Sequence, residues 1–293
     1  GGLLHMSRLV AGTVATLRVD RKEDYGYFLV NEYNKKVLLH NNEITKEIQI
    51  NDEIEVFLFH EGDGRLAATM TIPEIRLGIY GWGEVAGSRR NLGAFVNIGI
   101  SKDMLVSLDE LPLHSNVWPK TGDRLYITLT HDKTGRLFGK LATEDVIREI
   151  SVPAPENMRN KKLKGYIYKT KKVGSYLISD EGYRCFIHES ERQKEPRLGQ
   201  YVEARIIDEK EDGTLNASLL PLKQEKMGED SEIILQYLQN RGGAMPYGDK
   251  THPDDIMEVF EMSKGAFKRA LGKLMKEDKI YQEDGWTYTT DRR

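Results

Sequence analysis

The feature that most constrains this 293-residue chain is a pattern that occurs three times before residue 223. Each copy consists of five short segments in which apolar and polar residues alternate, and this period of two is typical of strands. One internal distance recurs, because Gly26 to His40 and Gly174 to His188 each span 14 residues. The last turn of each copy carries a glycine after a polar residue, at Asp63-Gly64, Thr134-Gly135 and Asp212-Gly213. The pattern predicts three small antiparallel barrels.

The repeats also set the domain organisation that we expect. A linker over 143–160 contains a short helical pattern followed by two prolines. Residues before Met6 are given no structural role. The expected barrels cover 6–72, 76–142 and 161–222, and a fourth domain covers 229–293.

Alternation along the strands assigns aromatic side chains to the outer faces of the barrels. If Tyr27 and Leu29 point into the first barrel, then Phe28 points outward. The same parity exposes Phe95 and Tyr176, and on the following strand of the third copy it places Phe186 and His188 on one face. The alternative is ordinary core packing, because a shift of one residue would reverse every assignment.

These residues carry a resemblance to a known domain. A G-x-[FY]-[VL] strand, followed by a segment such as FIHES at Phe186–Ser190 and a Gly-Asp-like turn, resembles the S1 RNA-binding domain of the OB-fold group. The second copy departs from the family at Leu105 and Ser107, and the first copy departs at Leu38. The resemblance places the surface aromatics at Phe28, Phe95, Tyr176 and Phe186, and the surface histidine at His40 and His188.

Such a surface would bind single-stranded RNA through its aromatic rings and its neighbouring cations. Unpaired bases stack on aromatic side chains with little dependence on sequence, and lysine or arginine side chains bind the phosphates. His188 can hydrogen-bond a base or phosphate as well as stack. For a surface histidine the competing interpretation is a side chain that caps a loop. The candidate phosphate-binding residues are Arg65, Arg89, Arg90, Arg136, Lys169, Lys171 and Lys172.

The charge of the chain at first opposes this interpretation. The formal net charge is −3, whereas proteins that bind phosphate broadly are usually basic. Basic residues are nevertheless concentrated locally: 161–174 carries six lysines and no acidic residue, and 263–276 carries five basic residues and no acidic residue. The simpler alternative for each stretch is a solvated face.

Beyond Lys223 the strand pattern gives way to a helical one. The order helix, helix, basic helix and hairpin, with the hairpin turning at Asp284-Gly285, resembles a winged helix. The third helix, from Ser263 to Glu277, is expected to bury an apolar side that includes Met275. Either nucleic acid or a protein partner fits this domain. Its candidate nucleic-acid-binding residues are Lys264, Lys268, Arg269 and Lys273.

The combination of three S1-like barrels and a winged helix is similar to the bacterial family of conserved virulence factor B over essentially the whole chain. The resemblance implies a mainly β multidomain fold and post-transcriptional control of gene expression, including virulence factors in pathogenic members. A DNA-binding transcription regulator acting through the winged helix, and a scaffold docking on a ribosome, polymerase or nuclease, remain alternatives.

An enzyme is not expected, because the sequence lacks a phosphate-binding Walker motif and an H-E-x-x-H helix. No cofactor and no metal are expected either. A single cysteine, Cys185, rules out an internal disulfide, and no apolar run approaches the length of a membrane span. The sequence therefore predicts a cytoplasmic binding protein.

Overall fold

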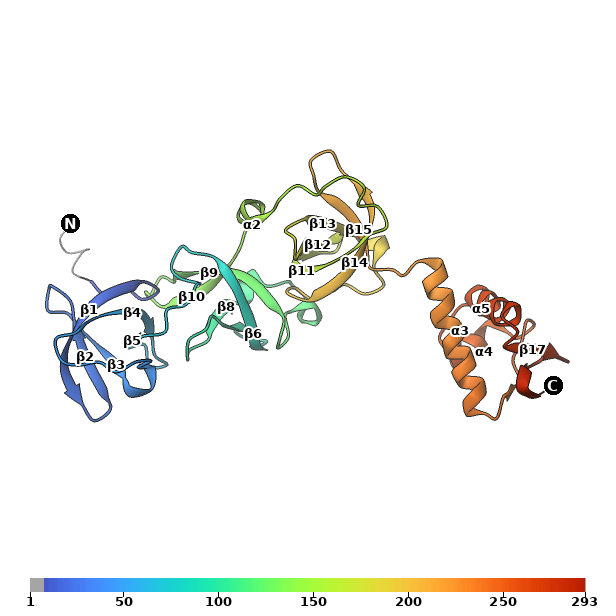
Figure 1. Ribbon diagram of the computed structural model, residues 1–293, viewed down its shortest axis with the longest axis horizontal. Helices are drawn as coiled ribbons and strands as arrows, with labels where there is room; N and C mark the ends of the chain where they lie inside the picture. Colours follow the sequence, from blue (N-terminus) through green and yellow to red (C-terminus); the bar gives the residue numbers. More distant parts are fainter. Residues whose placement is uncertain (1–7, 293) are drawn as a thin grey trace. The chain divides into compact units, whose positions relative to one another are not determined.

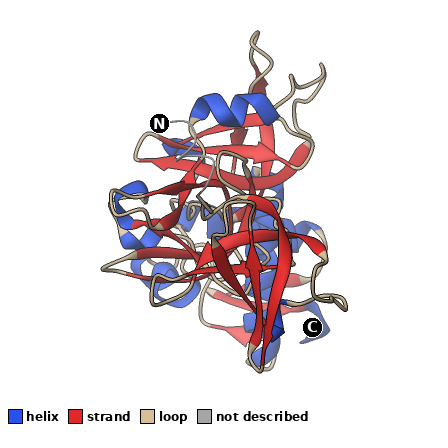
Figure 2. Ribbon diagram, turned by 90° about the vertical axis from the view of Figure 1, so that its left-hand side faces the viewer, coloured by secondary structure: helices blue, strands red, loops and turns tan. Residues whose placement is uncertain are grey.

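The computed structural model describes residues 8–292, so the expectation for the residues before Met6 lies outside the described part (Figure 1). The chain forms two compact units, the first ending at Leu219 and the second beginning at Leu220. The first unit consists of three closed five-stranded barrels, and the second contains helices and a three-stranded sheet. Figure 2, which colours strands red and helices blue, shows that strands dominate the molecule. The predicted mainly β fold is confirmed.

All three barrels have the same strand pairing, in which the third strand of each barrel pairs in parallel with the fifth. The first barrel contains β1 (Val14–Glu23), β2 (Gly26–Val30), β3 (Lys36–His40), β4 (Glu53–His60) and β5 (Leu66–Thr69). The second contains β6 (Gly81–Arg89), β7 (Gly93–Asn97), β8 (Met104–Ser107), β9 (Arg124–His131) and β10 (Leu137–Leu141). The third contains β11 (Lys162–Lys171), β12 (Gly174–Ser179), β13 (Arg184–His188), β14 (Tyr201–Glu209) and β15 (Leu215–Ser218).

Steric contacts explain why the second strand of each barrel begins with a glycine. A Cβ atom on Gly26 would lie 2.2 Å from the carbonyl oxygen of Leu39, and one on Gly93 would lie 2.0 Å from that of Val106. Both distances are far shorter than van der Waals contact, so the neighbouring strand can approach this closely only where the side chain is absent.

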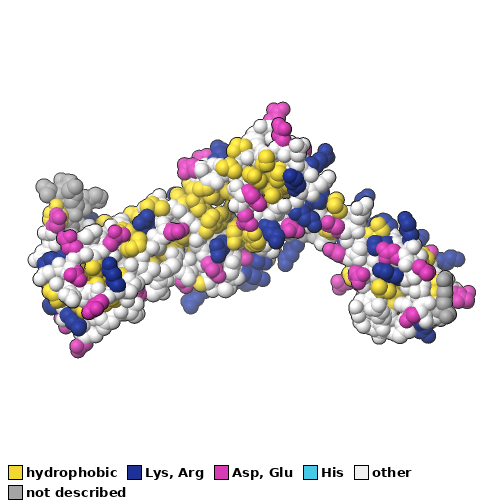
Figure 3. Space-filling view, viewed as in Figure 1, with side chains coloured by type: hydrophobic (Ala, Val, Ile, Leu, Met, Phe, Trp, Pro, Cys, Tyr) yellow, Lys and Arg dark blue, Asp and Glu magenta, His cyan; other side chains and the backbone are white. Residues whose placement is uncertain are grey.

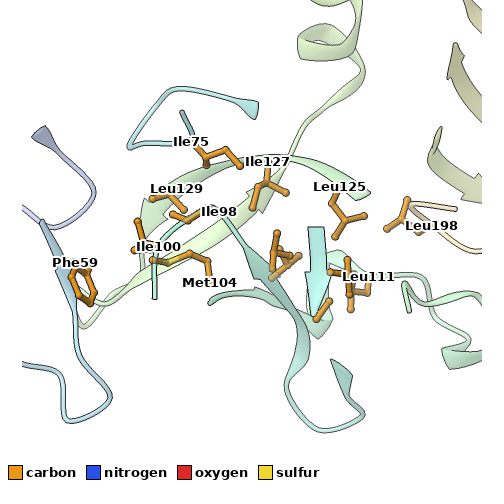
Figure 4. Packing of buried hydrophobic residues seen from close by; sticks show 14 of the residues in the cluster. Phe59, Ile75, Ile98, Ile100, Met104, Leu111, Leu125, Ile127, Leu129 and Leu198 are labelled. Carbon is orange, nitrogen blue, oxygen red and sulfur yellow. The ribbon is translucent and has the colours of Figure 1, made fainter. Parts of the chain in front are cut away.

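The hydrophobic core of the second barrel includes residues of both neighbouring barrels. Phe57 and Phe59 of β4 belong to the same buried cluster as Ile127 of β9. Leu198, which precedes β14 of the third barrel, joins this cluster at its other end (Figure 4). Ile75, in the connection between the first two barrels, is only 2% exposed. The connection between the first two barrels is therefore part of this core.

Polar contacts join the second barrel to the third. The guanidinium of Arg197 donates two hydrogen bonds to the Asp123 carboxylate, at 2.8 and 3.0 Å. This carboxylate raises the pKa of Arg197 above its ordinary value. Backbone hydrogen bonds of 2.9 Å from Arg124 to Gly199 and from Leu198 to Val117 add to the junction. The linker helix α2 (Glu144–Ile150) also contacts the third barrel, since Glu144 accepts a hydrogen bond from Arg184 at 3.1 Å.

The second unit has the order expected of a winged helix. Three helices enclose a single apolar cluster, and the sheet order is β16-β18-β17. Phe267, Ala270, Leu271 and Leu274 are buried, but the expectation for Met275 is wrong, because its side chain is 38% exposed near the end of the third helix. The elements are α3 (Lys223–Asn240), β16 (Ala244–Met245), α4 (Pro253–Phe260), α5 (Lys264–Lys276), β17 (Ile280–Glu283) and β18 (Trp286–Thr289).

The buried position of Cys185 leads to a prediction about its reactivity. Burial, followed by the nearby charge of Glu181, raises the pKa of the Cys185 thiol to about 12. Because the thiolate is the nucleophile, we expect no measurable reaction of the native protein with a thiol-specific disulfide reagent at about pH 8. The absorbance of the thiolate released from the reagent measures the rate of this reaction. The urea-unfolded chain is the control, and it should react at once. Rapid reaction of the native chain would contradict the prediction.

Candidate nucleic-acid interface

The outer face of the third barrel carries a cluster of aromatic rings on β12 and β13, which we call the platform and define as Tyr176, Phe186 and His188. Tyr176 and Phe186 are direct partners in the strand register, and their ring centroids are 5.0 Å apart. The rings of Phe186 and His188 are 6.3 Å apart. The alternating neighbours Leu177 and Cys185 are buried in the barrel core. Tyr176 and Phe186 are half-buried and His188 is exposed, so the cluster faces outward.

A glycine leaves room for the Phe186 ring on this surface. A Cβ atom on Gly174 would lie 2.4 Å from the Phe186 ring and 2.6 Å from the carbonyl oxygen of Ile187. Gly174 is the register partner of His188, so its missing side chain leaves the space that the Phe186 ring occupies. The backbone of β12 at Gly174 thus lies next to the ring.

Two lysines accompany the platform. The Lys169 ammonium lies 5.0 Å from the centroid of the Tyr176 ring, and the Lys210 ammonium lies 5.7 Å from the centroid of Phe186. Both distances allow cation–π attraction. Lys210 was not among the residues expected from the sequence. It lies in the turn between β14 and β15, and only closure of the barrel brings that turn to β13.

The turn between β11 and β12 exposes Lys171 and Lys172. Arg192 holds this turn, because its guanidinium donates hydrogen bonds to the carbonyl oxygens of Lys171 at 3.0 Å and Lys172 at 2.8 Å. Arg192 also donates a 2.6 Å hydrogen bond to the hydroxyl of Ser175, which is completely buried. The two lysines thus extend from a braced turn.

His188 both caps a loop and belongs to the platform. Its Nδ1 lies 3.2 Å from the backbone nitrogen and 2.8 Å from the hydroxyl of Ser190, in the short helix Glu189–Glu191. With Nδ1 occupied, Nε2 is the ring nitrogen through which His188 can bind a ligand. The two interpretations considered from the sequence are therefore compatible at this position.

Tyr168 extends the aromatic cluster and was not expected from the sequence. Its ring centroid is 6.2 Å from that of Tyr176, and its hydroxyl donates to Glu144 at 3.1 Å. Burial and the Glu144 carboxylate raise the pKa of Tyr168 well above its ordinary value. The linker helix thus fixes this ring, and strand alternation alone carries no signal for that contact.

In the first barrel the ring of Phe28 has its own cation, and the exposed ring of Tyr25 lies beside it at 6.4 Å between centroids. Phe28 lies opposite Leu38, and the guanidinium carbon of Arg21 is 4.6 Å from the centroid of the Phe28 ring. His40 is not part of an aromatic cluster, because its Nε2 lies 2.6 Å from a carboxylate oxygen of Glu61. Arg65 is exposed, and its Nε donates to Asp63 at 2.7 Å.

The second barrel is similar to the first. Phe95 lies opposite Leu105, and the guanidinium carbon of Arg89 is 6.0 Å from the centroid of the Phe95 ring. Arg90 is exposed in the following turn. Arg136 is directed toward the first barrel, because its Nη2 lies 3.5 Å from where a Cβ atom of Gly64 would stand.

The basic residues expected on α5 differ in solvent exposure and in ion pairing. Lys268 and Arg269 are exposed, while Lys264 is half-buried. Lys273 forms an ion pair with Glu277, and this pair contributes to lowering the pKa of the Glu277 carboxyl.

Within residues 8–292 there is no group of three or more potential metal-ligating side chains. None of the helices in that range is long and apolar enough to cross a membrane.

Figure 3 shows lysine and arginine side chains, in dark blue, around the third barrel and on the second unit. Three S1-type barrels and a winged helix place this chain in the class of nucleic-acid-binding proteins built from these two modules. Family models match all four domains. The S1 domain matches residues 11–71, and the first S1-like domain of CvfB matches residues 80–140. The second domain of virulence regulatory factor CvfB matches residues 147–221, and the CvfB-like winged helix domain matches residues 232–288.

Comparison with whole proteins gives the same result. The chain is 52% identical over 277 residues to protein YitL of Bacillus subtilis strain 168, covering 94% of this chain and 93% of that relative. It is 38% identical over 279 residues to conserved virulence factor B of Staphylococcus epidermidis ATCC 12228, again covering 94% and 93%. The chain therefore belongs to the family of conserved virulence factor B.

A solved structure from Streptococcus pneumoniae TIGR4, described as a multidomain protein with nucleic acid binding domains, has the same architecture. The TM-score is 0.65 at 36% identity, and the match covers 95% of this chain and 98% of that chain.

Proposed function

We propose that this chain is a non-enzymatic, cytoplasmic protein that binds single-stranded RNA and regulates gene expression after transcription. The observation that carries this proposal is the pair of opposed rings, Tyr176 and Phe186, with an ammonium group near each ring. Single-stranded nucleic acid presents base faces to such rings and phosphates to such cations. The match of residues 147–221 to the second domain of virulence regulatory factor CvfB supports a regulatory role, and we propose that it includes virulence factors in pathogens.

The third barrel is proposed as the principal RNA site. It carries two opposed aromatic residues, whereas Phe28 and Phe95 each lie opposite a leucine. Each stacked base contributes about 1–3 kcal/mol, so a second ring on the neighbouring strand adds a stacking interaction. The first two barrels are proposed to contribute weaker stacking at Phe28 and Phe95, each beside an arginine.

The braced turn of the third barrel predicts a salt effect. Lys171→Gln with Lys172→Gln is expected to reduce the slope of log affinity against log salt by roughly 0.7 for each phosphate that is no longer neutralised. Fluorescence anisotropy of a labelled single-stranded RNA across a salt series measures the slope. The matched control is Lys35→Gln with Lys36→Gln, which neutralises another exposed pair in the first barrel. Equal slopes in both double variants would contradict a special role for the turn.

A second candidate function is binding of duplex DNA by the winged helix, and the exposed Lys268 and Arg269 on α5 favour it. This function predicts that Lys268→Ala with Arg269→Ala abolishes binding of duplex DNA while single-stranded RNA binding is kept. A scaffold would be unaffected by either set of changes and would bring down a protein complex in a pull-down.

A further inference from the structure

A second aromatic surface lies on or next to strands that the platform does not use. Five rings follow one another in the first unit, and we call them the ladder: Tyr80, Tyr126, Trp82, Tyr166 and Tyr201. The successive ring centroids are 5.7, 5.0, 5.2 and 4.8 Å apart. We propose that the ladder is a docking surface for an extended segment of a partner protein that is rich in arginine and proline.

Strand register explains how the ladder forms. Trp82 and Tyr126 are direct partners on β6 and β9 of the second barrel, and Tyr166 and Tyr201 are direct partners on β11 and β14 of the third. The contact between Trp82 and Tyr166 joins the two pairs across the junction of the barrels. The platform lies on β12 and β13, so the two surfaces use different strands.

Joining the barrels does not account for the whole ladder. The junction is already held by the ion pair of Arg197 with Asp123 and by the insertion of Leu198 into the core of the second barrel. Only the contact of Trp82 with Tyr166 crosses the junction, whereas the ladder continues on both sides of it. The outermost ring, Tyr201, is 45% exposed. A row of partly exposed rings that continues beyond the junction is typical of a binding surface.

The charges around the ladder favour a cationic partner over a phosphate backbone. Burial first, and then the Glu149 carboxylate, raise the pKa of Tyr126. The Tyr201 hydroxyl donates to Asp180, which together with Glu181 raises the pKa of Tyr201 to about 12. The charged groups that bear on these two rings are thus acidic, and they would repel phosphates.

The nearest basic residues on the same strands lie opposite acidic ones. Arg124 is the register partner of Glu84, and Lys164 is the register partner of Glu203. Arginine stacks on tryptophan and tyrosine faces and is attracted by nearby carboxylates, while proline adds an apolar ring without rotamer entropy. The four steps between neighbouring rings are 4.8 to 5.7 Å each. Added together, they have about the length of six residues of an extended chain at ~3.3 Å each.

The test uses the full chain and a fluorescein-labelled peptide of alternating arginine and proline, with an alternating glutamate and proline peptide as the control ligand. We expect the basic peptide to bind and the acidic peptide not to bind. Tyr201→Ala should weaken binding about fivefold, and Tyr201→Phe, which keeps the ring, should leave it nearly unchanged. Glu149→Gln with Glu181→Gln should weaken binding severalfold and reduce its salt dependence.

The outcomes distinguish this proposal from the RNA proposal. Fivefold weaker peptide binding in Tyr201→Ala, with RNA binding intact and an unchanged midpoint of urea unfolding, supports the ladder as a peptide surface. Absence of peptide binding at millimolar concentration overturns it, as does equal binding of the acidic peptide. If single-stranded RNA binding is instead lost in Tyr201→Ala and kept in Tyr176→Ala with Phe186→Ala, the ladder is a nucleic-acid surface and the peptide proposal is wrong.

Discussion

Replacing both platform rings, Tyr176→Ala with Phe186→Ala, is expected to weaken single-stranded RNA binding by about 30-fold or more. The ring centroids are 5.0 Å apart on adjacent strands, and each stacked base contributes about 1–3 kcal/mol. Removing both stacking interactions costs at least about 2 kcal/mol, which corresponds to this factor. Lys169 and Lys210 remain in the variant, so the residual binding should keep its salt dependence.

Anisotropy titration with labelled single-stranded RNA measures the effect, with single-stranded and duplex DNA as comparison ligands. The matched control is Phe28→Ala with Phe95→Ala, which removes the corresponding outward ring from each of the other two barrels. A smaller reduction of affinity in the control would locate the principal site in the third barrel. Unchanged RNA affinity in the platform variant would remove the central proposal and point to the winged helix.

Gly93→Ala is expected to lower the free energy of unfolding by about 3 kcal/mol or more, in the upper range for single substitutions. The new methyl group would meet the carbonyl oxygen of Val106 at 2.0 Å, and this oxygen belongs to the backbone and cannot rotate away. The φ angle of +138° at Gly93 adds strain for any residue with a Cβ atom. Relief requires β7 and β8 to separate, which would disturb the core shared with the neighbouring barrels.

Urea unfolding followed by circular dichroism measures this decrease in stability. Gly87→Ala is the matched control in the same barrel, because a Cβ atom at Gly87 would have no neighbour within 4 Å. The free energy of unfolding of the control should lie within about 0.5 kcal/mol of that of the parent chain. Comparable stability of the two variants would show that the strands separate at little cost, contrary to the expected rigidity of the barrel.

Much of the fold could be predicted because it depends on local rules. Alternation of apolar and polar residues identifies strands, and a glycine at the same place in each repeat marks a close approach of two strands. Repetition made each weak signal stronger, as with the 14-residue spacing from Gly26 to His40 and from Gly174 to His188. The winged-helix order followed from a change of period after Lys223 and from the turn at Asp284-Gly285.

The contacts of the candidate site were less predictable, because they join segments that are distant in the sequence. His40 matches His188 in its repeat, yet His40 contacts Glu61 in its own barrel while His188 contacts the Phe186 ring. Lys210 lies near Phe186 only because the barrel closes. Spacing along the chain carries no information about which charged group from another strand will meet a given side chain.

The sequence by itself determined the three barrels, the winged helix and the family, since these depend on periodicity, turn residues and motif spacing. The tertiary structure alone decided that Phe57 and Leu198 complete the core of the second barrel and that Trp82 meets Tyr166 to form a continuous ladder. The physical reason is that strand alternation states which side of a strand a residue occupies. The packing of one barrel against the next decides what that side contacts.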